Sequence, residues 1–125
     1  MPEWMFPISP IAASRPRVSK HGAYFAGPYK VFRKEMQSLV PEVLGGGFFP
    51  MEGALSVDVE IYVKQPKKTI LDAPRADIDN YIKAIFDSLN GYLWEDDKQI
   101  QRVYAVKQWA PKCYDGYFTI GVDKL

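Results

Sequence analysis

Residues 73–100 read APRADIDNYIKAIFDSLNGYLWEDDKQI, and this stretch decides the fold. From residue 78 its apolar side chains recur at the i, i+4, i+7, i+8 and i+11 spacing of a helix that faces a core. The residues of this stripe are Ile78, Ile82, Ile85, Phe86 and Leu89. Asn90-Gly91 is a typical helix end, because both residues accept a left-handed backbone. The stretch therefore predicts a core-facing helix that begins at Ile78 and ends before Asn90.

Acidic residues gather along one flank of this predicted helix. At about 100° per residue, Asp79, Lys83 and Asp87 form a row beside the apolar stripe. Asp77 lies just outside the first turn, where an extended chain lets its side chain point toward the same place as Asp79. Two carboxylates held close repel each other unless one is protonated or a cation lies between them. Aspartate oxygens suit Mg²⁺, which proteins usually hold with one or two carboxylates plus water and substrate phosphates.

A second acidic pair, Asp96 and Asp97, follows a turn and directly precedes a strand-like segment. If that strand lies beside the helix, one member of the pair can join Asp77 and Asp79, because adjacent strand residues point to opposite faces. A simpler interpretation also fits the same residues. Asp79 is a common N-cap residue and forms a standard i, i+4 pair with Lys83, and the second acidic pair suits a solvated turn. The pattern alone leaves both interpretations open.

The rest of the chain predicts a small α+β domain. Residues 55–64 alternate between apolar and polar side chains, which is typical of a half-buried strand. A helix is predicted from Pro28, with apolar residues at helical spacing, and further strands over 101–109 and 117–123. Residues 1–27 indicate a short strand followed by irregular chain, because they are rich in Pro, Ser, Gly and Ala. We therefore expect a mixed β-sheet with two main helices packed on it.

Composition narrows the class of protein without naming a function. The chain has 125 residues with 47% apolar and 25% charged residues, which suits one globular domain. Its single cysteine, Cys113, excludes an internal disulfide and a CxxC zinc motif. No apolar run approaches the length of a membrane span, so we expect a cytoplasmic protein without a membrane partner. The net charge of +1 does not itself argue for nucleic-acid binding, although the basic residues favour the first 75 positions.

Taken whole, the opening stretch resembles the signature of the RusA family of Holliday junction resolvases. That signature has Asp-x-Asp-Asn, a Lys four residues after the second Asp, then Asp-x-Leu and Asp-Asp-x-Gln. The matching positions here are Asp77, Asp79, Asn80, Lys83, Asp87, Leu89, Asp96, Asp97 and Gln99. The segment SRPRVSKHGAYF is also similar to a basic N-terminal segment of many members. The resemblance covers roughly residues 7–33 and 55–123.

The resemblance implies a RusA-like endonuclease domain over residues 1–125, and a homodimeric, Mg²⁺-dependent enzyme of phage or prophage origin that cuts four-way DNA junctions in a bacterial host. Mn²⁺ is an expected substitute, and no organic cofactor is expected. Asp77, Asp79 and Asp97 match the catalytic metal-binding carboxylates, and Lys83 matches an essential lysine. Asn80, Asp87 and Asp96 are expected to support the site.

Contacts to DNA phosphates are expected from basic residues outside the acidic motif. The candidates are Arg15, Arg17, Lys20, Lys67, Lys68 and Arg75. Some family members carry several arginines immediately before the first motif aspartate, whereas here only Arg75 is so placed. Two alternatives remain open: a junction-binding protein of the same fold without turnover, and a nuclease that prefers another branched or flap DNA, or RNA.

Overall fold

The computed structural model describes residues 2–14, 17–24 and 27–125. Its main sheet contains four strands in the order β1-β6-β4-β5. Their bounds are β1 Glu3–Phe6, β4 Leu55–Val63, β5 Ile100–Trp109 and β6 Tyr117–Lys124. β4 pairs in parallel with β5 and antiparallel with β6, and β6 pairs antiparallel with β1. The predicted mixed sheet is therefore confirmed.

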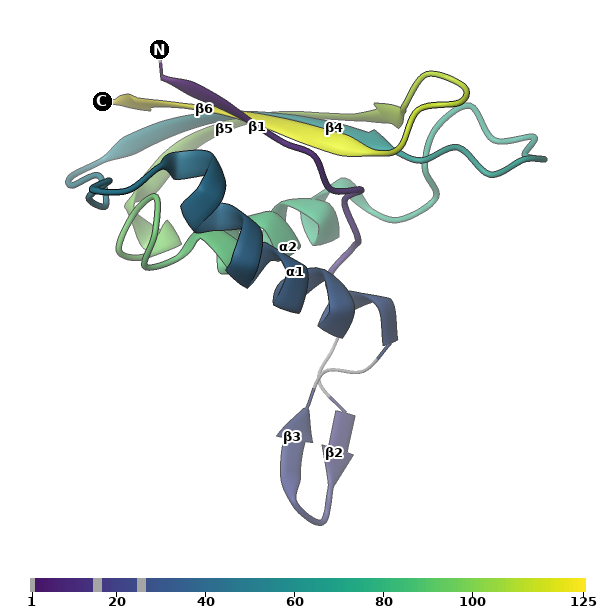
Figure 1. Ribbon diagram of the computed structural model, residues 1–125, viewed down its shortest axis with the longest axis horizontal. Helices are drawn as coiled ribbons and strands as arrows, with labels where there is room; N and C mark the ends of the chain where they lie inside the picture. Colours follow the sequence, from purple (N-terminus) through teal and green to yellow (C-terminus); the bar gives the residue numbers. More distant parts are fainter. Residues whose placement is uncertain (1, 15–16, 25–26) are drawn as a thin grey trace.

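Two helices cover one face of this sheet, as Figure 1 shows. They are α1 (Gly27–Leu44) and α2 (Ile78–Leu89), which agree with the predicted helices. Within the described residues, no helix has the length and apolar character needed to cross a membrane.

The core lies between the sheet and these helices. The alternation predicted for β4 is confirmed, because Leu55, Val57, Val59 and Ile61 are almost completely buried. α2 contributes Ile85 and Leu89 to the same core, and α1 contributes Phe32 and Met36 among others. Ile78 and Ile82 of the predicted stripe are half-buried at the edge of the core. Alternation and helical spacing therefore predicted the buried faces correctly.

A small hairpin corrects the expectation of irregular chain near the N-terminus. β2 (Arg17–Ser19) and β3 (Gly22–Tyr24) form a separate two-stranded antiparallel sheet. The turn between them uses a positive φ of 110° at Gly22 and a hydrogen bond from the His21 N–H to Ser19 Oγ. Strands of three residues are too short to display an alternation of apolar and polar residues, so the sequence pattern did not reveal them.

The parallel pairing of β4 and β5 determines where α2 lies. Parallel neighbours need a crossover connection, which here consists of the 64–77 loop, α2 and the 90–99 turn. In Figure 1 the loop that follows β4 and the turn between β5 and β6 extend from one end of the sheet, and the two termini lie at the other end. The loop then returns beneath the sheet and enters α2, so the N-terminal end of this helix faces the loop end of the molecule.

Candidate functional site

Asp77 and Asp79 lie at the start of α2 with exposed side chains. Asp77 occupies the N-cap position in an extended conformation (φ −65°, ψ 140°), but its side chain makes no capping hydrogen bond. Asp79 is in the first helical turn and is not the cap. Within the described residues neither carboxylate forms a hydrogen bond or an ion pair. The interpretation of Asp79 as a simple cap is therefore wrong, and both carboxylates are available to a ligand.

Lys83 and Asp87 form the ion pair on the flank of α2. Lys83 Nζ lies 3.3 Å from Asp87 Oδ2, so the i, i+4 partner of this lysine is Asp87 and not Asp79. A second cation, Arg33 of α1, places Nη1 3.9 Å from the same oxygen and also donates to the Tyr29 hydroxyl at 3.1 Å. The Asp87 side chain is 23% exposed and that of Lys83 is 65% exposed. Asp87 therefore restrains the Lys83 side chain through this ion pair, while much of the lysine side chain stays exposed to solvent.

Asp96 and Gln99 build a short turn that presents Asp97. The 3₁₀ helix η1 (Asp97–Gln99) begins with a capping box between Asp96 and Gln99, and Asp96 Oδ1 also accepts from the Lys98 N–H at 2.9 Å. Gln99 Oε1 accepts from the N–H groups of Glu95 and Asp96, at 3.0 and 3.1 Å. The Asp96 carboxylate is therefore used by the turn, which separates its role from that of Asp97.

The Asp97 side chain is half-buried. Burial raises the pKa of its carboxyl group, as do a hydrogen bond with Asp96 and the charges of Asp87 and Asp96, whereas Lys83 lowers it. Asp97 is thus within reach of the charges of Lys83, Asp87 and Asp96. No group of three or more metal-ligating side chains placed to hold a metal ion occurs in residues 2–14, 17–24 and 27–125. The carboxylates themselves are ligands that Mg²⁺ prefers, and a cation would offset the acidic charges that add to burial in raising the Asp97 pKa.

The chain before Asp77 is fastened to β5 by two side chains. Lys107 Nζ donates to the carbonyl oxygens of Pro74 and Ala76, at 2.9 and 2.7 Å. Trp109 Nε1 donates to the carbonyl oxygen of Leu71 at 3.0 Å. Sequence reasoning missed both residues, because a single lysine or tryptophan in a strand carries no local signal of a bond across 30 or more residues. Together they fix the path of the loop into the two carboxylates.

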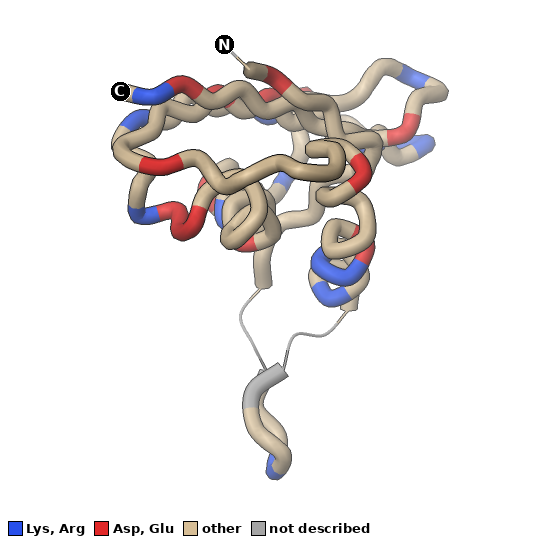
Figure 2. The backbone as a smooth tube through the Cα atoms, turned by 60° about the vertical axis from the view of Figure 1, so that its left-hand side comes forward, with Lys and Arg blue, Asp and Glu red and all other residues tan. Residues whose placement is uncertain are grey.

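The predicted DNA-binding residues fall into two places. Lys67, Lys68 and Arg75 line one hollow beside the 64–77 loop, and Lys20 is exposed in the turn of the β2–β3 hairpin. Arg15 lies outside the described residues, and for Arg17 only the backbone, within β2, is described. Figure 2 shows further basic residues on α1, where the sequence contains Lys30, Arg33 and Lys34.

A family model described as Endodeoxyribonuclease RusA matches residues 7–115, which is most of the 125-residue chain. The chain belongs to the RusA family. No curated protein matches the sequence. The resemblance drawn from the acidic motif is thus confirmed, and so is the α+β RusA fold.

Membership of the RusA family implies the endonuclease activity of Holliday junction resolvases, which are hydrolases that bind branched DNA. RusA nucleases depend on a divalent metal ion. The expectation that Asp77, Asp79 and Asp97 hold the metal ion stays a prediction, and the structure gives the contacts of the other motif positions. Asp87 pairs with Lys83, and Asp96 and Gln99 form the capping box of the turn that contains Asp97. Asn80 binds the N-terminal segment through its backbone, because its carbonyl oxygen accepts a hydrogen bond from the Ala13 N–H at 2.9 Å.

Proposed function

We propose that this RusA chain is a Mg²⁺-dependent endodeoxyribonuclease that resolves four-way DNA junctions by paired symmetric nicks, in recombination and repair. The observation that carries the proposal is the pair of exposed carboxylates at the start of α2, Asp77 and Asp79, which have no partner within the described residues. A protein that only bound DNA would gain nothing from uncompensated negative charge against phosphates. A nuclease that holds a cation there would turn the same charge into a phosphate-binding site.

Asp77, Asp79 and Asp97 are the proposed metal ligands, with Mn²⁺ as a substitute for Mg²⁺. The ion would supply charge neutralisation at the scissile phosphate and lower the pKa of a bound water molecule. The 64–77 loop orients the first two carboxylates, because Lys107 holds the carbonyl oxygens of the residues just before them. The capping box orients the third, because it fixes the turn in which Asp97 lies.

Lys83 is proposed to stabilise negative charge on the phosphate as the bond breaks. Its ammonium group is largely exposed and lies one helical turn beyond Asp79 on the same flank. The ion pair with Asp87 restricts the lysine side chain, so the charge is in place before the substrate arrives. Arg33 shares Asp87 and adds positive charge to the same flank.

A homodimer is proposed for two reasons. A four-way junction is close to two-fold symmetric and needs two opposed nicks, which a two-fold dimer provides with two sites. β5 is also an edge strand whose Val103, Tyr104 and Val106 side chains are exposed, and such an edge suits pairing with another chain.

The test is cleavage of a synthetic four-way junction in Mg²⁺ by wild type, Asp79→Asn and Asp58→Asn. Asp58 is a matched control, because its side chain points to the face of the sheet away from the helices. Asp79→Asn should lose more than about 100-fold in rate while junction binding persists, since even the loss of an outer-shell partner of a metal costs about 10- to 100-fold. Undiminished cutting by Asp79→Asn would refute the mechanism. Wild-type binding without cutting, with or without EDTA, would favour the binding protein without turnover.

Substrate choice and subunit sharing need two further measurements. Four-way, three-way, flap and linear DNA, and RNA, should be compared at one salt concentration, because salt shifts all such affinities. If the two copies share ligands, mixing Asp79→Asn with Asp97→Asn chains should restore part of the activity that each variant lacks.

A further inference from the structure

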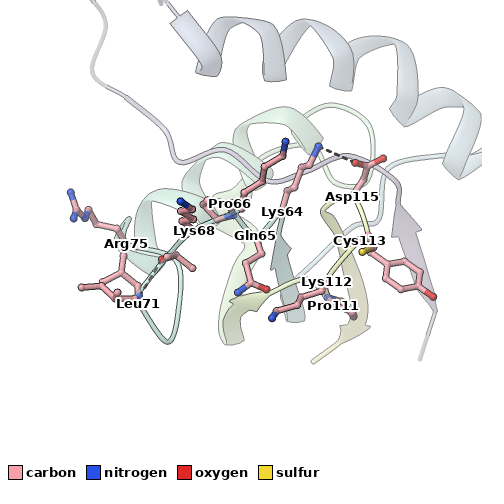
Figure 3. A pocket seen from close by; sticks show the side chains of 14 residues that line it. Lys64, Gln65, Pro66, Lys68, Leu71, Arg75, Pro111, Lys112, Cys113 and Asp115 are labelled. Carbon is pink, nitrogen blue, oxygen red and sulfur yellow. Dashed lines mark hydrogen bonds and ion pairs between the residues drawn. The ribbon is translucent and has the colours of Figure 1, made fainter.

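A hollow of about 1050 Å³ lies between the loop that follows β4 and the turn between β5 and β6 (Figure 3). One wall consists of residues 64–71 with Arg75, and the other consists of residues 111–115. The hollow lies beyond the end of the sheet at which both loops project, away from the chain termini (Figure 1). None of the residues of the acidic motif lines this hollow.

The side chains that line the hollow are strongly basic. Its cationic residues are Lys64, Lys67, Lys68, Arg75 and Lys112, and its only acidic residue is Asp115. Lys64 Nζ lies 3.5 Å from Asp115 Oδ1, so this acid is already paired within the hollow. The charge that remains is positive and suits an anionic polymer. Tyr114 is 65% exposed among these cations, and exposed aromatic rings between basic residues are typical of nucleic-acid surfaces.

Both walls are attached to the same strand, which gives the hollow a defined shape. Trp109, at the end of β5, binds the carbonyl oxygen of Leu71 in the first wall. The chain leaves β5 directly into the second wall, where the Tyr114 N–H donates to the Pro111 carbonyl oxygen at 3.0 Å. The Ala110 N–H donates to the Val63 carbonyl oxygen at 2.8 Å and so joins the bases of the two walls. These hydrogen bonds hold the two walls next to each other at their bases.

The hollow is also continuous with the catalytic segment. Arg75 lines it and stands two residues before Asp77, and the chain between them is held to β5 by Lys107. A DNA strand whose phosphate lies at Asp77 and Asp79 would therefore meet this hollow as it leaves the site. Successive phosphates would then face the lysines of both walls.

We propose that this hollow binds the phosphodiester backbone of DNA next to the scissile phosphate, and that Lys112 is a phosphate contact alongside Lys67, Lys68 and Arg75. The contacts do not read sequence, because the lining cations meet phosphate charge and not base edges. This inference rests on the proposed nuclease function, since it takes DNA as the substrate.

The test is the salt dependence of binding to a fluorescent four-way junction in EDTA, between about 50 and 200 mM NaCl. Lys112→Ala should weaken binding several-fold and reduce the slope of log Kd against log[NaCl] by about 1, as expected for one lost phosphate contact. Lys112→Ala combined with Lys68→Ala should reduce the slope by about 2. Lys124→Ala is the matched control, because this exposed lysine is at the other end of the molecule and should leave the slope unchanged.

A wild-type slope and affinity of Lys112→Ala for the junction would overturn the inference. This holds even if the variant loses binding to polyglutamate, an anionic polymer that is not a nucleic acid. Failure of the nuclease function has a different result. The slopes would then fall as expected while wild type cuts no junction in Mg²⁺.

Discussion

Gln99 provides the sharpest test of how the turn that carries Asp97 is held. Its side-chain oxygen accepts hydrogen bonds from two N–H groups, those of Glu95 and Asp96, at 3.0 and 3.1 Å. Its side-chain nitrogen donates to the carbonyl oxygens of Met51 and Gly53, at 2.9 and 3.0 Å. One amide thus joins the turn before β5 to the loop before β4, and all of its bonding capacity toward these two segments is used.

Gln99→Leu removes these four hydrogen bonds with little change in volume. Each neutral hydrogen bond contributes about 0.5–1.5 kcal/mol net. Because the side chain is half-exposed and water can replace some partners, we expect a loss of about 2–3 kcal/mol in the free energy of unfolding. For a chain of this size, 1 kcal/mol shifts the melting temperature by about 3–5 °C, so Tm should fall by about 6–15 °C.

The assay is thermal unfolding followed by circular dichroism at pH 7, with Gln101→Leu as the control. Gln101 is an exposed residue of β5 with no side-chain hydrogen bond in the described residues, so its replacement should leave Tm almost unchanged. Junction cleavage at a temperature where Gln99→Leu is still folded should also fall, because Asp97 loses its fixed position. A Tm within about 1 °C of wild type would refute the assigned role of the amide.

Three more predictions follow from other contacts. Lys107→Met should reduce the cleavage rate constant and weaken the response to Mg²⁺ with little effect on junction affinity, and Lys107→Arg should recover part of the loss; equal rates for wild type and Lys107→Met would contradict this. Asp97→Asn should raise Tm at pH 7, because a carboxyl group whose folded-state pKa is raised above 3.8 costs stability once it ionises. This gain in Tm should vanish as the pH falls below that value. A gain that persists in acid would contradict the raised pKa as its cause. Gly116→Ala should destabilise the fold by about 1–3 kcal/mol in urea denaturation, because the added Cβ would meet Ser9 Cβ at 2.6 Å and its Cα at 2.8 Å, whereas the open site Gly46→Ala should not.

The elements with a strong period were predicted well from the sequence. The alternation of residues 55–64 corresponds to β4, and the stripe from Ile78 corresponds to α2. Periodicity is a property of neighbouring residues, so it survives in a sequence read without its fold. The β2–β3 hairpin did not show this signal, because three residues per strand cannot display a period.

The candidate site was predictable only as a set of residue types in order. The motif placed Asp77, Asp79 and Asp97 among the ligand candidates, and that assignment stays a prediction. Local spacing did not show that Lys83 pairs with Asp87 and not with Asp79. Spacing also did not show that Arg33 of α1, which lies outside the helix, shares the same Asp87 oxygen.

The sequence by itself determined which faces are buried, where α2 begins and ends, and to which family the acidic motif belongs, because these depend on residues a few positions apart. Only the tertiary structure decided that β6 lies between β1 and β4, and that β4 pairs in parallel with β5. Only the tertiary structure also shows that Lys107 binds the loop before Asp77, and that Lys112 lines the same hollow as Lys67 and Lys68. These arrangements join segments about 30 or more residues apart, and their partners are selected by strand pairing and packing that no local pattern records.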